Sequence, residues 1–133
     1  MEELKESRVW QRVRGGGDPA EELRQCMQKQ GELLGMYRAL SRRGGRGRQL
    51  YEQKQHQIDC LRGLLRVTTG QPIAPPRSPE VRLDLLRCHR AELEFLGFLL
   101  QRSREGELAA IFDALMERQK CQCRLVLELL GTM

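Results

Sequence analysis

Residues 48–65, RQLYEQKQHQIDCLRGLL, carry apolar side chains at the spacing of one helix face. The leucines from Leu50 to Leu65 recur at intervals that place them on the same side of an α-helix. The two turns between them carry Lys54 and Gln57 on that same side. A helix face that packs against a core is expected to be apolar along its length. This stretch therefore predicts a helix whose buried face is interrupted by polar groups.

The composition is that of a helical protein. The chain of 133 residues is rich in Leu, Arg, Gln and Glu and contains only five prolines, which favours helix formation and is enough for one core. Its Gly-rich stretches act as punctuation between helices. We divide the chain into an N-terminal segment with a Gly-rich linker, 1–17, and a bundle domain, 18–133. Residues 1–14 could form a short helix.

Nothing in the sequence predicts association with a membrane. The longest apolar run, FLGFLL at 95–100, is far shorter than the ~20 residues that a membrane span needs. The first residues lack the apolar region of a signal peptide. The five cysteines are an odd number without framework spacing, which is typical of free thiols in a reducing compartment. We expect a cytoplasmic protein.

Four helices are predicted, and their order gives an all-α four-helix bundle. Asp18 and Pro19 form a good helix start, and Ser78 followed by Pro79 and Glu80 forms another. The caps and the apolar periodicity predict helices over 19–42, 48–67, 79–103 and 107–130. The first and last connections are short, so each joins antiparallel neighbours.

The middle connection is longer and rich in proline. Residues 68–79, TTGQPIAPPRSP, would extend roughly 35 Å at ~3.1 Å per residue, about the length of the neighbouring helices. The segment could therefore cross the full height of the bundle and start a helix parallel to the second one. A segment of this length would equally make an ordinary loop.

Each predicted helix has a polar interruption near the middle of its apolar face. The interruptions are Gln30 in the first helix, Lys54 and Gln57 in the second, His89 and Glu92 in the third, and Gln119 and Gln122 in the fourth. Antiparallel packing brings them to a similar height, which predicts one internal polar layer. Because an unpaired buried lysine is costly, we expect Lys54 to be paired with Glu92. The other residues of the layer would complete a hydrogen-bonded network.

This arrangement resembles the ferritin-like superfamily, especially its rubrerythrin-type members. There, one Glu from each of helices one and three and a Glu-x-x-His from each of helices two and four hold two metal ions. The family's Glu-x6-Tyr is matched by Gln30 and Tyr37, and its Glu-x-x-His-x3-Leu is matched at 54–61 and 119–126. The resemblance covers about 19–130. It implies a ferritin-like bundle with a Pro-rich crossover between helices two and three.

The metal ligands of the family are replaced in this chain. The six ligand positions correspond to Gln30, Lys54, Gln57, His89, Gln119 and Gln122. None of them is a carboxylate, Lys54 places an ammonium where a cation would sit, and neutral amide oxygens are weak ligands. Glu92 is the only acid left on the core side. We therefore expect no metal and no cofactor at these positions. The layer would fix helix packing or, using His89 and Glu92, hold a single metal ion or small ligand.

A second register would keep more ligands. It uses Glu32, Gln53, His56, Glu92, Glu117 and Lys120. This set restores three acids and one histidine and would make the chain a rubrerythrin-like oxidoreductase or metal-binding protein with iron or manganese. It would also bury polar faces and expose leucines, at ~1.5–3 kcal/mol for each large apolar side chain. We favour the first register.

Thiol chemistry has little support in the sequence. Cys26 and Cys123 are expected to face inward, where a free cysteine behaves as a small apolar residue. Cys121 and Cys123 point apart on their helix, which makes them a poor zinc motif. Thiol chemistry is possible at Cys60, Cys88 or Cys121, but the sequence places no activating base at a defined distance from them.

Two classes of function remain. The chain is either a non-catalytic bundle in a structural or protein-interaction role, or the metal-dependent oxidoreductase of the second register. In the first case we expect a homodimer or a protein partner, with Val9 and Trp10 as one contact.

The net charge of +5 comes mainly from arginines, which include Arg42, Arg43, Arg46 and Arg48 around a Gly-rich turn. No aromatic residues are interleaved with these arginines as a nucleic-acid surface would require, so we do not expect nucleic-acid binding.

Overall fold

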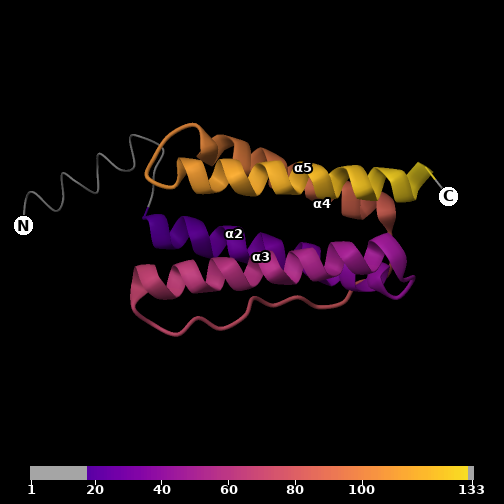
Figure 1. The fold of residues 1–133 in the computed structure, drawn as a ribbon, viewed down its shortest axis with the longest axis horizontal. Coiled ribbons are helices and arrows are strands. Elements are labelled where there is room, and N and C mark those ends of the chain that lie inside the picture. Colours follow the sequence, from indigo (N-terminus) through magenta and orange to yellow (C-terminus); the bar gives the residue numbers. More distant parts are fainter. Residues whose placement is uncertain (1–17, 132–133) are drawn as a thin grey trace, which may run out of the picture.

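The computed structural model describes residues 18–131, which form four α-helices packed as a bundle (Figure 1). The helices are α2 (Pro19–Ser41), α3 (Gly45–Thr69), α4 (Leu85–Ser103) and α5 (Ala109–Gly131). α2 packs chiefly against α3, and α4 against α5, and the two helices of each pair run in opposite directions. The predicted all-α four-helix bundle is confirmed. The expected short helix over 1–14 and the contact through Val9 and Trp10 lie outside the described residues.

The start of α2 agrees with the sequence, whereas the start of α4 does not. The side chain of Asp18 accepts a hydrogen bond from the Ala20 N–H at 3.2 Å, with proline at the first helical position. α4 does not begin at Ser78 as predicted. Its N-cap is Asp84, which accepts from the Arg87 N–H at 3.1 Å. The carbonyl of Ser78 instead accepts from the guanidinium of Arg38 at 2.8 Å, which holds this part of the chain against α2.

The segment between α3 and α4 contains no helix or strand and runs along the outside of the α2/α3 pair (Figure 1). The guanidinium of Arg62 on α3 donates to the carbonyl of Ile73 at 2.8 and 3.0 Å. The backbone of Arg77 passes so close to α2 that a Cβ at Gly31 would lie 2.7 Å from its carbonyl oxygen. The segment is therefore fastened along its length to the helices beside it.

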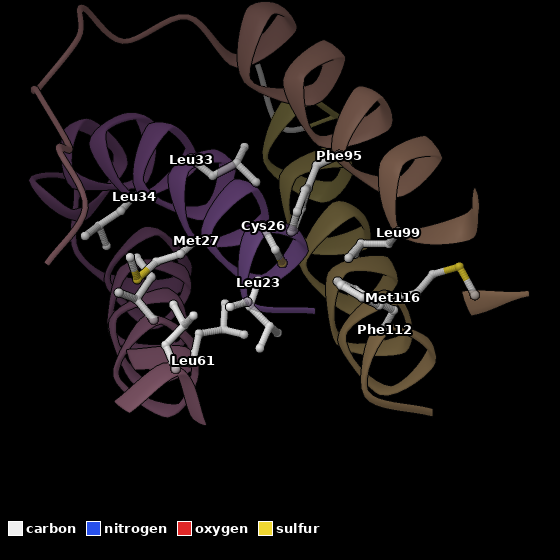
Figure 2. Close-up of a cluster of buried hydrophobic side chains, with 13 residues drawn as sticks. Leu23, Cys26, Met27, Leu33, Leu34, Leu61, Phe95, Leu99, Phe112 and Met116 are labelled. Carbon is white, nitrogen blue, oxygen red and sulfur yellow. The ribbon is translucent and has the colours of Figure 1, made fainter. Parts of the chain in front are cut away.

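The interior contains two apolar clusters. In the larger one, Leu23 and Cys26 of α2 face Phe95 of α4 and Phe112 of α5 (Figure 2). The smaller cluster comprises Tyr37, Leu40, Leu50, Leu85, Cys88 and Val126. Both clusters are formed by residues of the apolar helix faces predicted from the sequence. None of the helices in the described part of the chain combines the length and apolar character needed to cross a membrane.

Candidate functional site

On α3, α4 and α5, a layer of buried polar side chains lies between residues of the two apolar clusters. Its members are Gln30, Lys54, Gln57, Glu92, Gln119 and Gln122, and they are all the buried polar or charged residues of the described chain. Each belongs to the polar interruptions seen in the sequence. His89, the remaining predicted member, lies at the edge with 21 % of its side chain exposed. The sequence therefore located the layer correctly, because helical spacing alone determines which residues of a helix face the core.

Lys54 lies at the centre of the layer and is 0 % exposed. Its Nζ donates to the amide oxygens of Gln30, Gln57 (3.0 Å) and Gln119 (2.7 Å). These acceptors come from three different helices and use the three donors of an ammonium group. Burial lowers the pKa of Lys54 to about 7. The predicted pairing with Glu92 is wrong, because the amide oxygens take all of the donors.

Glu92 is held on one oxygen only. Its Oε2 accepts from the hydroxyl of Tyr37 and from Nε2 of Gln119 at 3.1 Å. Its Oε1 has no hydrogen-bond partner among residues 18–131 and lies 3.6 Å from Nδ1 of His89, which has none either. Burial raises the pKa of Glu92 above its ordinary value, although hydrogen bonding from Tyr37 opposes the shift.

Gln119 connects Lys54 to Glu92. Its carbonyl oxygen accepts from Lys54, and its Nε2 donates to Glu92 and, at 3.2 Å, to the hydroxyl of Tyr37. Gln122, one turn further along α5, is equally buried, but neither atom of its amide has a hydrogen-bond partner in the described chain. The expectation that Gln122 completes the network is therefore wrong, since the donors of Lys54 are already used.

The residues of the second register lie elsewhere. Glu32, Gln53, His56 and Glu117 are exposed. Lys120 is half-buried, and its Nζ lies 3.0 Å from the carboxylate of Glu117 at the surface. Glu92 alone of that set lies in the core. The structure does not bring these six residues together.

The cysteines divide into buried and exposed groups. Cys26, Cys88 and Cys123 are buried, as predicted for the first and the last, whereas Cys60 and Cys121 are exposed. Burial raises the pKa of Cys26 to about 12 and that of Cys123 to about 11. At neutral pH these thiols are therefore protonated and weakly nucleophilic.

One grouping was not anticipated from the sequence. His89 and Glu92 of α4 and Cys123 of α5 present ligand atoms that all lie within 4.8 Å of one another. The i, i+3 spacing of the first two is visible in the sequence. The approach of Cys123 depends on how α4 and α5 are paired, and no pattern within either helix reveals it.

Three arginines in the region 42–48 form ion pairs with acidic side chains. Arg42 pairs with Glu80 at 2.6 Å, and Arg48 pairs with Glu52 at 3.1 Å. Arg46 pairs with Glu128 of α5. The Arg46 pair joins α3 to α5, whereas the Arg48 pair lies within α3, and the three pairs offset part of the positive charge of this region.

Comparisons with known proteins give no relative. No protein-family model matches the chain, and no curated protein or solved structure matches it either.

Proposed function

We propose that the chain is a non-catalytic bundle of ferritin-like architecture, in which a lysine–amide network has replaced the paired metal ions, and that it works by self-association. Two features support the architecture. In Figure 1, α3 and α4 run in the same direction, and the Pro-rich segment between them extends along the helices. A single long crossover between two helical hairpins is the connectivity of ferritin-like bundles.

The observation that carries the proposal is the position of Lys54. In the register matched to the family, Lys54 and Gln57 occupy the Glu-x-x-His of helix two, and they are buried at the centre of the layer. The amino group of Lys54 and its hydrogen bonds to three amide oxygens fill that centre. Two divalent ions would need several anionic ligands, and Glu92 is the one buried carboxylate among residues 18–131.

Self-association is supported by a stripe of exposed leucines on α4. Leu86, Leu93 and Leu100 are 69, 53 and 44 % exposed and are spaced by seven residues, the repeat of a coiled-coil seam. Leu86 and Leu100 are equidistant from Leu93 along the helix. A two-fold axis at Leu93 would therefore place Leu86 against Leu100 of a second copy and bury the whole stripe. Exposed apolar stripes of this kind mark interaction surfaces.

Metal reconstitution tests the replacement of the site. The variant that restores the family's ligands carries Gln30→Glu, Lys54→Glu, Gln57→His, His89→Glu, Gln119→Glu and Gln122→His. Expressed with iron and manganese, it should contain about two ions per chain by elemental analysis. A matched variant that retains Lys54 should not hold the pair. Two ions in the unmodified protein, or none in the folded restored variant, would overturn the assignment.

Sedimentation analysis tests the association. The unmodified protein should be a dimer, and Leu93→Glu should make it a monomer with unchanged helix content by circular dichroism. Val67→Glu is the control, because Val67 is 83 % exposed on α3 but lies outside the stripe, and it should remain a dimer. A monomeric unmodified protein, or a dimer that survives Leu93→Glu, would contradict self-association through α4.

A further inference from the structure

The α4/α5 side of the polar layer contains a cluster of possible metal ligands, which Gln119 joins to the lysine network. His89 and Glu92 lie one turn apart on α4, and Cys123 approaches them from α5. The distance from His89 Nδ1 to Glu92 Oε1 is 3.6 Å. Two ligands of one tetrahedral ion at ~2.1 Å from the metal lie ~3.4 Å apart, so this pair already has the separation that a shared ion requires.

The carboxylate of Glu92 is oriented for a ligand. Its Oε2 is fixed by donors from Tyr37 and Gln119, in the manner of the outer hydrogen bonds that orient metal-binding carboxylates. Its Oε1 is buried without a hydrogen-bond partner in the described chain, as is Nδ1 of His89. Buried polar atoms are almost always satisfied. His89 Nδ1 and Glu92 Oε1 face each other across 3.6 Å, and an ion held between them would satisfy both atoms.

We propose that His89, Glu92 and Cys123 bind a single divalent transition-metal ion of the zinc or cobalt class. Imidazole nitrogen, carboxylate oxygen and thiolate sulfur are all zinc ligands, and three protein ligands leave a fourth position for water or a small molecule. Binding requires the Cys123 thiol to release its proton to solvent. This site differs in ligands and ion number from the pair of ions in ferritin-like proteins, and it does not rest on the proposed function.

Charge balance favours one ion rather than two. The Glu92 carboxylate and the Cys123 thiolate together neutralise one divalent cation, which makes its burial acceptable. The donors of Lys54 are directed to amide oxygens, and Lys54 reaches Glu92 through Gln119. His89 is the partly exposed ligand of the three, which places the site at the edge of the layer.

Cobalt titration of the reduced full-length protein tests the proposal. We expect one equivalent to bind with the near-ultraviolet absorption of a sulfur-to-cobalt charge transfer, and zinc to displace it. Cys123→Ser should lose this absorption. Cys121→Ser is the matched control, since Cys121 lies two residues away on the exposed face of α5, and it should keep the absorption.

A second variant covers the case in which Cys123→Ser does not fold. His89→Ala removes a partly exposed ligand and should weaken cobalt binding by about tenfold or more. Unchanged affinity in His89→Ala would overturn the proposal, as would no cobalt binding by the folded protein. Loss of the absorption in Cys60→Ser would overturn it too, because it would place the cobalt at the surface of α3. There, Sγ of Cys60 lies 3.7 Å from Nε2 of His56. None of these outcomes bears on self-association or on the two-ion site.

Discussion

The two sides of the polar layer differ in how completely their polar atoms are satisfied. On the α2/α3 side, all three donors of Lys54 reach amide oxygens, those of Gln30 and Gln57 and that of Gln119 on α5. On the α4/α5 side, atoms of His89, Glu92 and Gln122 are buried without hydrogen-bond partners in the described chain. Both sides carry polar interruptions of the apolar face in the sequence. Satisfied polar atoms are what a purely structural role requires, whereas the unpartnered atoms are the observation on which the proposed metal site rests.

The largest expected effect on the free energy of unfolding comes from removing the side chain of Lys54. Lys54→Ala would leave three buried amide oxygens without a donor and open a cavity, so it should lower the free energy of unfolding by about 3–5 kcal/mol. Urea unfolding measures this. Gln55→Ala, on the exposed face of the same helix, is the control and should stay within about 0.5 kcal/mol of the unmodified protein. A loss below about 1 kcal/mol for Lys54→Ala would mean that the network contributes little.

The hydroxyl of Tyr37 joins the two sides, since it donates to Glu92 and accepts from Gln119. Tyr37→Phe should cost about 1–3 kcal/mol in urea unfolding, because it removes one of the two donors to a buried carboxylate. Tyr51→Phe is a suitable control, because the Tyr51 hydroxyl accepts a hydrogen bond from Gln55 at the surface. Equal effects of the two substitutions would contradict the special position of Tyr37.

The pKa of Lys54, lowered to about 7, predicts how stability depends on pH. Above pH 7 the unfolded chain keeps the proton on Lys54 while the folded chain loses it, so the free energy of unfolding should rise with pH. The rise should approach ~1.4 kcal/mol per pH unit. The window is pH 7 to 8.5, because cysteines of the unfolded chain ionise above it and reverse the trend through Cys26 and Cys123. Lys54→Met should abolish the slope, and a slope that persists in this variant would assign it to other groups.

The smallest expected effect has the opposite sign. Gln122→Met replaces a buried amide that has no partner in the described chain by an apolar side chain of similar size, so it should be neutral or stabilising by about 1 kcal/mol. Gln119→Met removes a bridging amide and should destabilise. Thermal unfolding of the two variants compares neighbouring positions on one helix. Destabilisation by Gln122→Met equal to that of Gln119→Met would show that Gln122 has partners in solution.

The membership of the layer could be predicted from the sequence, but its internal contacts could not. Helical spacing alone placed Gln30, Lys54 and Gln119 in the core, because it fixes which face each residue occupies. Whether Lys54 meets Glu92 or amide oxygens depends on side-chain reach across three helices, which no single helix encodes. For that reason the predicted pairing of Lys54 with Glu92 was wrong.

The prediction of helix boundaries from the sequence was limited for a similar reason. The start of α2 depends only on local capping by Asp18, and it was predicted correctly. Ser78 has the same local signal, but its carbonyl accepts from Arg38 of α2, and α4 begins at Leu85 with Asp84 as its N-cap. The grouping of Cys123 with Glu92 likewise follows from the packing of α5 on α4.

The most direct test of the contrast between the two sides is a crystal structure of the protein grown with cobalt, with data collected at the cobalt absorption edge. The account predicts one anomalous peak between His89, Glu92 and Cys123 and none beside Lys54. Two peaks within the layer around Gln30, Lys54 and Gln57 would contradict it, because they would place metal ions where the amino group of Lys54 is held.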